Sequence, residues 1–262
     1  MPDALGPINN SISPPPIIRV EDVTVGYGRS ITLQNVSFEV QRGEVFAILG
    51  GSGCGKSTLL KNMIGLYQPL AGRVMIGDQD IATASGEARD ALLRRFGVMY
   101  QQGALFGSMT LLQNIRLPLE EYTALPKDAI DLIARMKLDL VGLVGAASLM
   151  PAELSGGMRK RGAIARAMAL DPDILFLDEP SAGLDPITSV ELDQLILRLA
   201  KNLGITFVIV SHELASIFTI ADRVLMLDKT TKGIIAIGNP HKLKESSDNP
   251  SVRAFFNRTV DA

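Results

Sequence analysis

The sequence is short of cysteine, of histidine and of long apolar runs. Its single cysteine excludes an intrachain disulfide and fits a reducing compartment. No apolar run approaches the roughly 18–20 residues that a helix needs to cross a bilayer, and the N-terminus shows no secretory signal. The net charge of −2 gives no electrostatic reason to expect a nucleic-acid partner. We therefore expect a soluble chain that reaches any membrane through another protein.

The remaining composition indicates a globular protein with an ample core. Hydrophobic residues make up 47% of the 262 residues and charged residues 21%, which excludes a disordered chain. We predict a proline-rich, disordered or extended lead-in over 1–16 and a main domain over 17–238. A helical subdomain is expected within that domain at about 104–160, and a polar extension over 239–262.

A glycine-rich loop organises the sequence. Residues 50–58 follow the pattern G-x-x-x-x-G-K-[ST], between an apolar strand predicted over 45–49 and a helix that ends near Gly65. A phosphate-binding loop requires this strand–loop–helix context. A dinucleotide site has another glycine spacing and no use for the lysine. The loop comprises Gly50, Gly51, Ser52, Gly53, Cys54, Gly55, Lys56, Ser57 and Thr58.

The residue types in this loop fit a nucleoside triphosphate. Glycines let several backbone N–H groups turn toward a phosphate chain, and the following helix adds a partial positive charge there. Lys56 is expected to reach the β- and γ-phosphates, and Ser57 to offer its hydroxyl to Mg²⁺. The thiol of Cys54 is expected beside the phosphates, where alkylating reagents would attack it and ATP would protect it.

Polar side chains follow three further predicted strands. Asp178 and Glu179 end one apolar strand, Gln101 follows a second and His212 a third. Ligands of parallel α/β sheets bind at the carboxyl ends of the strands. We expect Asp178 and Gln101 to contribute to an Mg²⁺ site and Glu179 to act as general base toward water. We expect His212 to touch the γ-phosphate. Taken alone, Gln101 is also compatible with a plain strand end and His212 with an idle surface position.

A second predicted helix start also suits an anion. Ser155, Gly156 and Gly157 precede a helix that should run to about Leu170. Because the Lys56 loop already serves one triphosphate, this second site is surplus unless it binds the nucleotide of a neighbouring molecule. A simple helix cap is the alternative.

Two later segments give structural expectations. The helix after Pro186 should end at Gly204, and the adjacent aromatics Phe255 and Phe256 suggest docking, for which we take a second copy of the chain as the partner. The core-facing positions of that helix should be Ile187, Val190, Leu195, Ile196, Leu199 and Leu203.

Taken in order, these motifs resemble those of ATP-binding cassette (ABC) transporter ATPases over about residues 17–240. The resemblance implies an α/β fold: a P-loop NTPase (RecA-like) core with an antiparallel β subdomain and an inserted α-helical subdomain. It also implies ATP and Mg²⁺ as cofactors and hydrolysis of ATP to ADP and phosphate, coupled to transport. The motifs are Tyr27, the loop at 50–58, Gln101, Leu154–Met158, Asp178–Glu179, Asp185 and His212.

The same resemblance implies roles for single residues. Tyr27 would stack on adenine, and Gln101 would couple Mg²⁺ and water to the membrane subunit. The family works as a head-to-tail pair with two ATP molecules between the subunits. In that pair, residues 155–157 would close over the ATP of the other subunit, Asp185 would lie at the seam and His212 would sense the γ-phosphate.

A finer resemblance is to the ATPase of the maintenance-of-lipid-asymmetry system, which serves phospholipid transport between the inner and outer membranes of Gram-negative bacteria. It rests on residues 102–106, 117–119 and 181–187, and on Met158 in place of the commoner signature glutamine. It implies a permease, a mammalian-cell-entry lipid-binding protein and a small STAS-domain protein as partners. The chain would then lie peripherally on the cytoplasmic face of the inner membrane.

Two alternatives use the same motifs. One is the ATPase of another ABC transporter, such as a small-solute importer, in which the chemistry would be identical. The other is a soluble ABC protein that acts on ribosomes or DNA. The single cassette, the lack of a heptad run and the lack of a basic patch disfavour the second.

Overall fold

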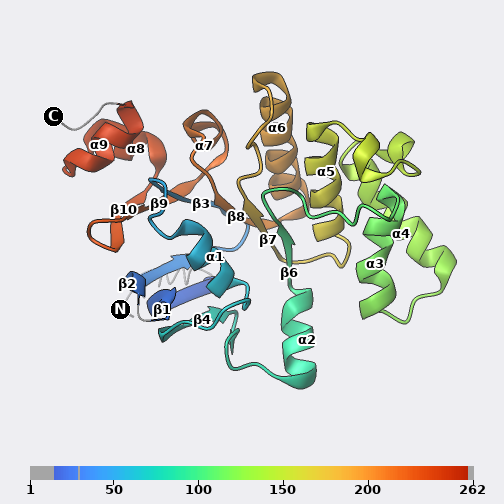
Figure 1. Ribbon diagram of the computed structural model, residues 1–262, viewed down its shortest axis with the longest axis horizontal. Helices are drawn as coiled ribbons and strands as arrows, with labels where there is room; N and C mark the ends of the chain where they lie inside the picture. The colour runs from blue at the N-terminus through green and yellow to red at the C-terminus, as the bar shows by residue number, and fades with distance from the viewer. Residues whose placement is uncertain (1–14, 29, 259–262) are drawn as a thin grey trace, which may run out of the picture.

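The computed structural model describes residues 15–28 and 30–258, so nearly all of the predicted lead-in over 1–16 lies outside the described residues. A six-stranded sheet forms the centre of the molecule and a four-stranded sheet lies beside it (Figure 1). Helices pack against both faces of the central sheet. Within the described ranges, no helix combines the length and the apolarity needed to cross a bilayer.

The central sheet is parallel except at one edge. Its order is β10-β9-β3-β8-β7-β6, and within it only β10 runs antiparallel to its neighbour. Helices cover both faces, so the inner strands are almost continuously apolar and buried. Parallel pairing brings the carboxyl ends of neighbouring strands to one edge. The strands are β3 Val45–Gly50, β6 Phe96–Met99, β7 Ile174–Asp178, β8 Thr206–Val210, β9 Arg223–Asp228 and β10 Gly233–Gly238.

The second sheet is antiparallel, in the order β2-β1-β4-β5. Helix α1 (Lys56–Met63) shares one hydrophobic cluster with this sheet and with one face of the central sheet. Phe38 of β2 and Phe46 of β3 stack with ring centroids 5.4 Å apart, which fixes the two sheets against each other. The strands are β1 Ile18–Tyr27, β2 Ser30–Val40, β4 Ala71–Ile76 and β5 Gln79–Asp80.

A group of helices covers the other face of the central sheet. Leu175 and Leu177 of β7 join a cluster with Ile164 of α5 and Leu195 of α6, and α3 and α4 extend this cluster outward (Figure 1). The elements of this region are α3 Leu111–Tyr122, α4 Lys127–Leu140, the short 3₁₀ helices η1 Val144–Ala146 and η2 Pro151–Glu153, α5 Gly156–Ala167 and α6 Pro186–Leu203. Helix α2 Gly86–Arg94 lies on the opposite side, where its Leu92 joins the cluster of the antiparallel sheet.

The C-terminal helices fold back onto the chain itself. Val252 and Phe256 are buried in a cluster with Leu49 of β3 and Met226 of β9. The prediction that the aromatic pair docks on a second copy is therefore wrong for Phe256, whose ring is used within this chain. The helices are α7 Leu214–Ile220, α8 Pro240–Ser246 and α9 Pro250–Asn257.

Helix α6 differs from the prediction on one face. Ile187, Val190 and Leu203, expected in the core, are 75%, 53% and 50% exposed. Ile187 and Val190 lie off the buried stripe, and Leu203 is the last residue of the helix, just before Gly204 turns the chain with φ +66°. The buried apolar positions follow the i, i+3, i+4, i+7 rule and are Leu192, Leu195, Ile196 and Leu199.

Two predicted helix boundaries also shift. Proline is common at the first position of a helix, so the sequence predicts a helix that begins at Pro126, but in the structure this residue is extended and directly precedes α4. Helix α5 ends at Ala167, three residues before the predicted Leu170, because Met168 leaves the helical conformation at φ −87° and ψ 0°. Both corrections concern turns, which short-range sequence patterns locate poorly.

Gly97 lets β6 and α5 approach each other closely, because a Cβ atom there would lie 2.0 Å from the carbonyl oxygen of Ala167. We predict that Gly97→Ala lowers the free energy of unfolding by about 1–3 kcal/mol, since the strand or the helix must shift. Urea unfolding measures the effect. Gly145→Ala is the matched control, because a Cβ atom there meets nothing within 4 Å. Equal stability of the two variants would contradict the prediction.

Candidate functional site

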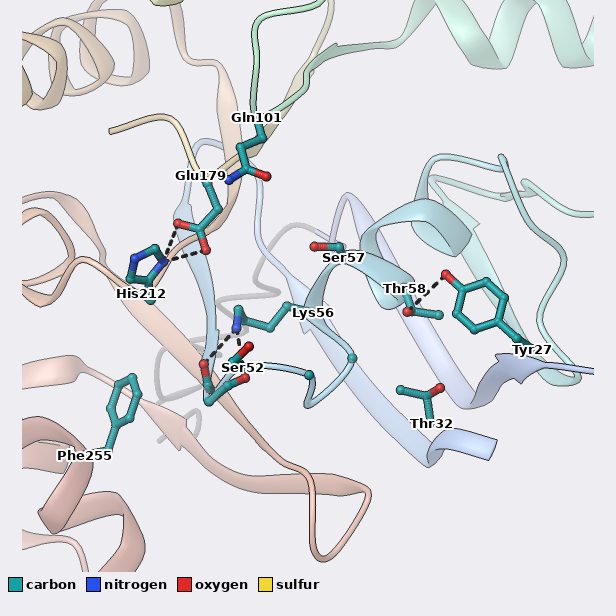
Figure 2. A pocket seen from close by; sticks show the side chains of 14 residues that line it. Tyr27, Thr32, Ser52, Lys56, Ser57, Thr58, Gln101, Glu179, His212 and Phe255 are labelled. Carbon is teal, nitrogen blue, oxygen red and sulfur yellow. Dashed lines mark hydrogen bonds and ion pairs between the residues drawn. The ribbon is translucent and has the colours of Figure 1, made fainter. Parts of the chain in front are cut away.

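A cleft of roughly 700 Å³ lies at the carboxyl edge of the central sheet, over the start of α1 (Figure 2). Residues from the ends of β3, β6, β7 and β8 meet there, as the parallel register requires. The cleft is lined by Tyr27, Thr32, Gly50, Gly51, Ser52, Gly53, Gly55, Lys56, Ser57, Thr58, Gln101, Glu179, His212 and Phe255.

The loop between β3 and α1 forms the floor of the cleft. Gly50 has φ +145°, and a Cβ atom there would lie 2.4 Å from the carbonyl oxygen of Leu227, so the first position of the loop requires glycine. The Lys56 ammonium donates to the carbonyl oxygens of Gly50 (2.8 Å) and Gly51 (3.2 Å) and lies across the loop (Figure 2). The N-terminus of α1, directly after Gly55, adds its partial positive charge at the same place.

Cys54 is the one loop residue between 50 and 58 that does not line the cleft. Its side chain is 1% exposed and packs under the loop in the cluster that contains Leu59 and Leu60. The expectation of a thiol beside the phosphates is therefore wrong, because the loop backbone directs this side chain into the core and away from the cleft. Burial raises the pKa of the Cys54 thiol, and the nearby Lys56 charge offsets that effect only partly.

Glu179 and His212 form a pair at the rim of the cleft. The imidazole Nδ1 lies 2.8 Å from both carboxylate oxygens of Glu179 (Figure 2). The Glu179 backbone has φ +49°, an unusual conformation for a residue with a side chain, and its N–H donates to the carbonyl of Val210 at 2.8 Å. The side chain of Glu179 is 11% exposed and that of His212 is 58% exposed. A carboxylate held in this way can accept a proton from a water molecule in the cleft.

Asp178 ends β7 with one carboxylate oxygen, Oδ1, that is buried and has no hydrogen-bond partner among the described residues. Burial raises the pKa of the Asp178 carboxyl, and the neighbouring Glu179 charge raises it further. Such an orphaned oxygen is what a site for a hard cation provides. Ser57 and Gln101 line the cleft and supply further oxygen atoms, whereas Asp178 does not line it and precedes the lining residue Glu179.

These donors fit Mg²⁺ rather than a transition metal. Across residues 15–28 and 30–258, no group of three or more His, Cys, Asp and Glu side chains is placed to hold a metal ion. One carboxylate, one hydroxyl and one amide leave most positions of an octahedral ion to water and phosphate oxygens, the arrangement that Mg²⁺ favours. The residues present therefore fit the predicted ion.

Tyr27 stands at the far end of the cleft from His212 and Phe255 (Figure 2). It is 53% exposed, its hydroxyl lies 3.4 Å from Oγ1 of Thr58, and its ring meets that of Tyr67 edge to face at 5.9 Å. Sequence patterns did not single out Tyr67 as a neighbour of Tyr27, although it lies only four residues after the end of α1. They also gave no sign that Phe255, about 200 residues from the loop, would line the cleft.

The second predicted anion site lies apart from this cleft. The hydroxyl of Ser155 accepts from the N–H of Met158 at 3.2 Å and caps α5, with Gly156 and Gly157 in its first turn. Asp185 caps α6: its Oδ1 accepts from Ile187 and Thr188, and its Oδ2 accepts from the Thr188 hydroxyl at 2.6 Å. These bonds lower the pKa of the exposed Asp185 carboxyl.

The two caps lie close to each other. A Cβ atom on Gly157 would sit 2.4 Å from Cγ2 of Thr188, so glycine is needed for the first turns of α5 and α6 to pack. The structure therefore joins the segment at 155–157 with Asp185 and separates both from the cleft of the same chain.

Burial of Cys54 leads to a prediction that replaces the earlier expectation. We expect iodoacetamide at pH 8 to alkylate the folded chain far more slowly than the chain unfolded in urea, and ATP to make little difference. Because burial raises the pKa of Cys54, less of this thiol is ionised at pH 8 in the folded chain than in the unfolded chain. Burial also limits the access of the reagent to the sulfur atom. Mass spectrometry reports the site without ambiguity, since Cys54 is the only cysteine. Equal rates in the folded and unfolded chains would contradict this.

Comparisons with known proteins agree with this site. Residues 33–182 match the ABC transporter family. The "Intermembrane phospholipid transport system ATP-binding protein MlaF" of Haemophilus influenzae is 40% identical, over 88% of this chain and 87% of its own length. The "Probable ribonucleotide transport ATP-binding protein mkl" of Mycobacterium leprae is 41% identical, over 92% of this chain and 68% of its own.

A solved structure with the same fold is the dimeric, post-hydrolysis state of the ATP-binding cassette MJ0796 bound to ADP and Pi. It superposes with a TM-score of 0.75 at 30% identity and covers 85% of this chain and 98% of that one. The predicted fold class, a P-loop NTPase core with an antiparallel β subdomain and helical additions, is confirmed. The chain belongs to the ABC transporter family of ATP-binding proteins.

Proposed function

We propose that this chain is the ATP-hydrolysing subunit that energises phospholipid transport between the inner and outer membranes. The observation that carries the enzymatic part is the meeting of Lys56, Glu179 and His212 in one cleft on the phosphate-binding loop. Identity of 40% to a phospholipid-transport ATP-binding protein over most of both chains supports the substrate class.

Within the cleft, each side chain has a proposed role. The loop amides, the α1 dipole and the Lys56 ammonium bind the phosphates, after Lys56 exchanges its bonds to the loop carbonyls for phosphate oxygens. Tyr27 stacks on the adenine. Glu179 orients the attacking water and accepts its proton, while His212 holds the Glu179 carboxylate and reaches the γ-phosphate. Catalysis then rests on positioning and electrostatics.

Ser57, Gln101 and Asp178 are the residues that would hold Mg²⁺. When bound, the ion supplies charge neutralisation between the β- and γ-phosphates. Asp178 brings the buried oxygen without a partner, and Gln101 follows β6 on a short loop that can connect the site with a membrane subunit.

A second copy of the chain would complete the site. Ser155, Gly156, Gly157 and Asp185 lie outside the cleft of their own chain. Ser155 and Asp185 are exposed and Gly156 is half-buried, whereas Gly157 is buried against α6. We propose that they close over the ATP of the partner in a head-to-tail dimer. A dimeric relative of the same fold is in line with this arrangement.

The membrane partners follow from the proposed transport role. They are an integral permease, a mammalian-cell-entry lipid-binding protein and a small STAS-domain protein, with this chain peripheral on the cytoplasmic face of the inner membrane. The helices within 104–160 are the proposed contact with the permease, and 239–262 the proposed accessory extension. Ribonucleotide transport is the competing substrate class, because the relative named for it is equally similar at 41% identity.

We predict that Glu179→Gln lowers the turnover of ATP by roughly 10²- to 10⁴-fold, the usual contribution of a general base, while ATP still binds. Phosphate release measures the turnover and titration calorimetry measures the binding. Glu39→Gln, an exposed carboxylate on the antiparallel sheet, is the matched control and should leave both unchanged. Near-normal turnover in the Glu179 variant would remove this residue from the role.

The transport role is tested with the Glu179→Gln chain expressed together with its native gene neighbours. We expect detergent extracts to yield this chain with a permease, a mammalian-cell-entry protein and bound phospholipid, identified by mass spectrometry. A permease with a solute-binding protein, or ATP hydrolysis stimulated by ribonucleotides, would move the substrate to the competing class and leave the ATPase site as proposed.

A further inference from the structure

Lys160 is a buried cation that links α5 to two loops of the cleft. It lies on α5, one and a half turns after the Ser155 cap, and is 7% exposed. Its ammonium donates to the backbone carbonyl of Gln101 and, at 3.2 Å, to the backbone carbonyl of Glu179. A buried lysine costs free energy unless its charge is compensated. The carbonyl oxygens of Gln101 and Glu179 are the groups that compensate the buried charge of Lys160 by accepting its hydrogen bonds.

The two carbonyl groups belong to residues just beyond the ends of two strands, where the regular pairing of the sheet stops. Glu179 directly follows Asp178, the last residue of β7, and Gln101 lies two residues after Met99, the last residue of β6. Glu179 is also held at φ +49°, a conformation that costs free energy in a residue with a side chain. The bonds from Lys160 restrain both segments, together with the bond from the Glu179 N–H to Val210.

The helix that carries Lys160 is held firmly by its neighbours. Helix α5 is locked to β6 by the close contact of Gly97 with Ala167, and to α6 by that of Gly157 with Thr188. The position of the Lys160 ammonium is therefore defined relative to the start of α5.

The charges around Lys160 favour this arrangement. Burial lowers the pKa of the Lys160 ammonium, and the nearby carboxylates of Glu179 and Asp178 act in the opposite direction. Its hydrogen bonds, however, go to backbone oxygens, so the Glu179 carboxylate stays free to pair with His212.

We propose that Lys160 is a positioning residue for ATP hydrolysis, which sets the places of Gln101 and Glu179 relative to the first turn of α5. One helix then defines the loops of the chain's own cleft and presents Ser155–Gly157 to the nucleotide of the partner. This inference rests on the proposed roles of Glu179 and of the segment at 155–157, and adds a residue that fixes their geometry.

The test compares Lys160→Met with Lys160→Gln in the full chain purified with its native membrane partners. Methionine and glutamine have the same length, but only glutamine can donate to the carbonyl groups. We expect Lys160→Met to lower kcat roughly 10- to 10²-fold, since small misplacements of catalytic groups have effects of this size. The KM for ATP should stay within about threefold, because Lys160 does not itself line the cleft. Lys160→Gln should recover kcat to within about fivefold of the wild type, as a neutral donor bonds more weakly than a charged one.

A second buried lysine supplies the control. Lys137 of α4 is also 7% exposed, but it pairs with Asp171 away from the cleft. Lys137→Met should lower the midpoint of thermal unfolding without a selective loss of kcat. If Lys160→Met kept the wild-type kcat, or if its loss of kcat tracked a loss of thermal stability and glutamine did not recover it, the inference would be overturned.

The Glu179→Gln variant separates this inference from the function on which it rests. Loss of turnover in Glu179→Gln together with normal turnover in Lys160→Met rejects the role of Lys160 alone. Normal turnover in Glu179→Gln rejects the proposed role of Glu179, whatever Lys160→Met does.

Discussion

The site depends on the parallel register of β3, β8, β7 and β6 in the central sheet. Strands that run in the same direction end at the same edge, so the loop after β3, Gln101 after β6, Glu179 after β7 and His212 after β8 meet in one cleft. The start of α1 lies at this edge and supplies a partial positive charge directed at an anion. No single motif forms this cleft, because its lining combines the loop after β3 with residues that follow three other strands.

The polar groups of the cleft are held by bonds between segments that are distant in sequence. His212 reaches the Glu179 carboxylate, the Glu179 N–H reaches Val210, and Lys160 reaches the Gln101 and Glu179 carbonyls. Each bond fixes a residue just beyond the end of a strand, where the regular pairing of the sheet stops. This explains how the conformation of Glu179 at φ +49° is maintained next to the cleft.

The N-terminal ends of α1 and α5 differ in their position relative to the cleft. That of α1 lies beneath it, whereas that of α5 lies apart from it and packs on the first turn of α6 through Gly157 and Thr188. In the proposed head-to-tail dimer the start of α5 would serve the nucleotide of the partner, in line with the dimeric state of the similar MJ0796 cassette.

Sequence patterns predicted the apolar strands, the phosphate-binding loop and the carboxylates after β7, because these depend on residues adjacent in the chain and on short-range chemistry. They also supported the ABC transporter family through the order of motifs. The exposed positions of α6 and the two helix boundaries were mispredicted, since packing against neighbouring elements decides which apolar residues are buried.

By itself, then, the sequence determined the local chemistry: which loop turns its amides toward phosphate and which acids end a strand. Only the tertiary structure decided that Cys54 points under the loop, that Phe255 borders the cleft and that Lys160 binds the Gln101 and Glu179 carbonyls. These contacts join segments up to about 200 residues apart, and their geometry is set by how helices and sheets pack.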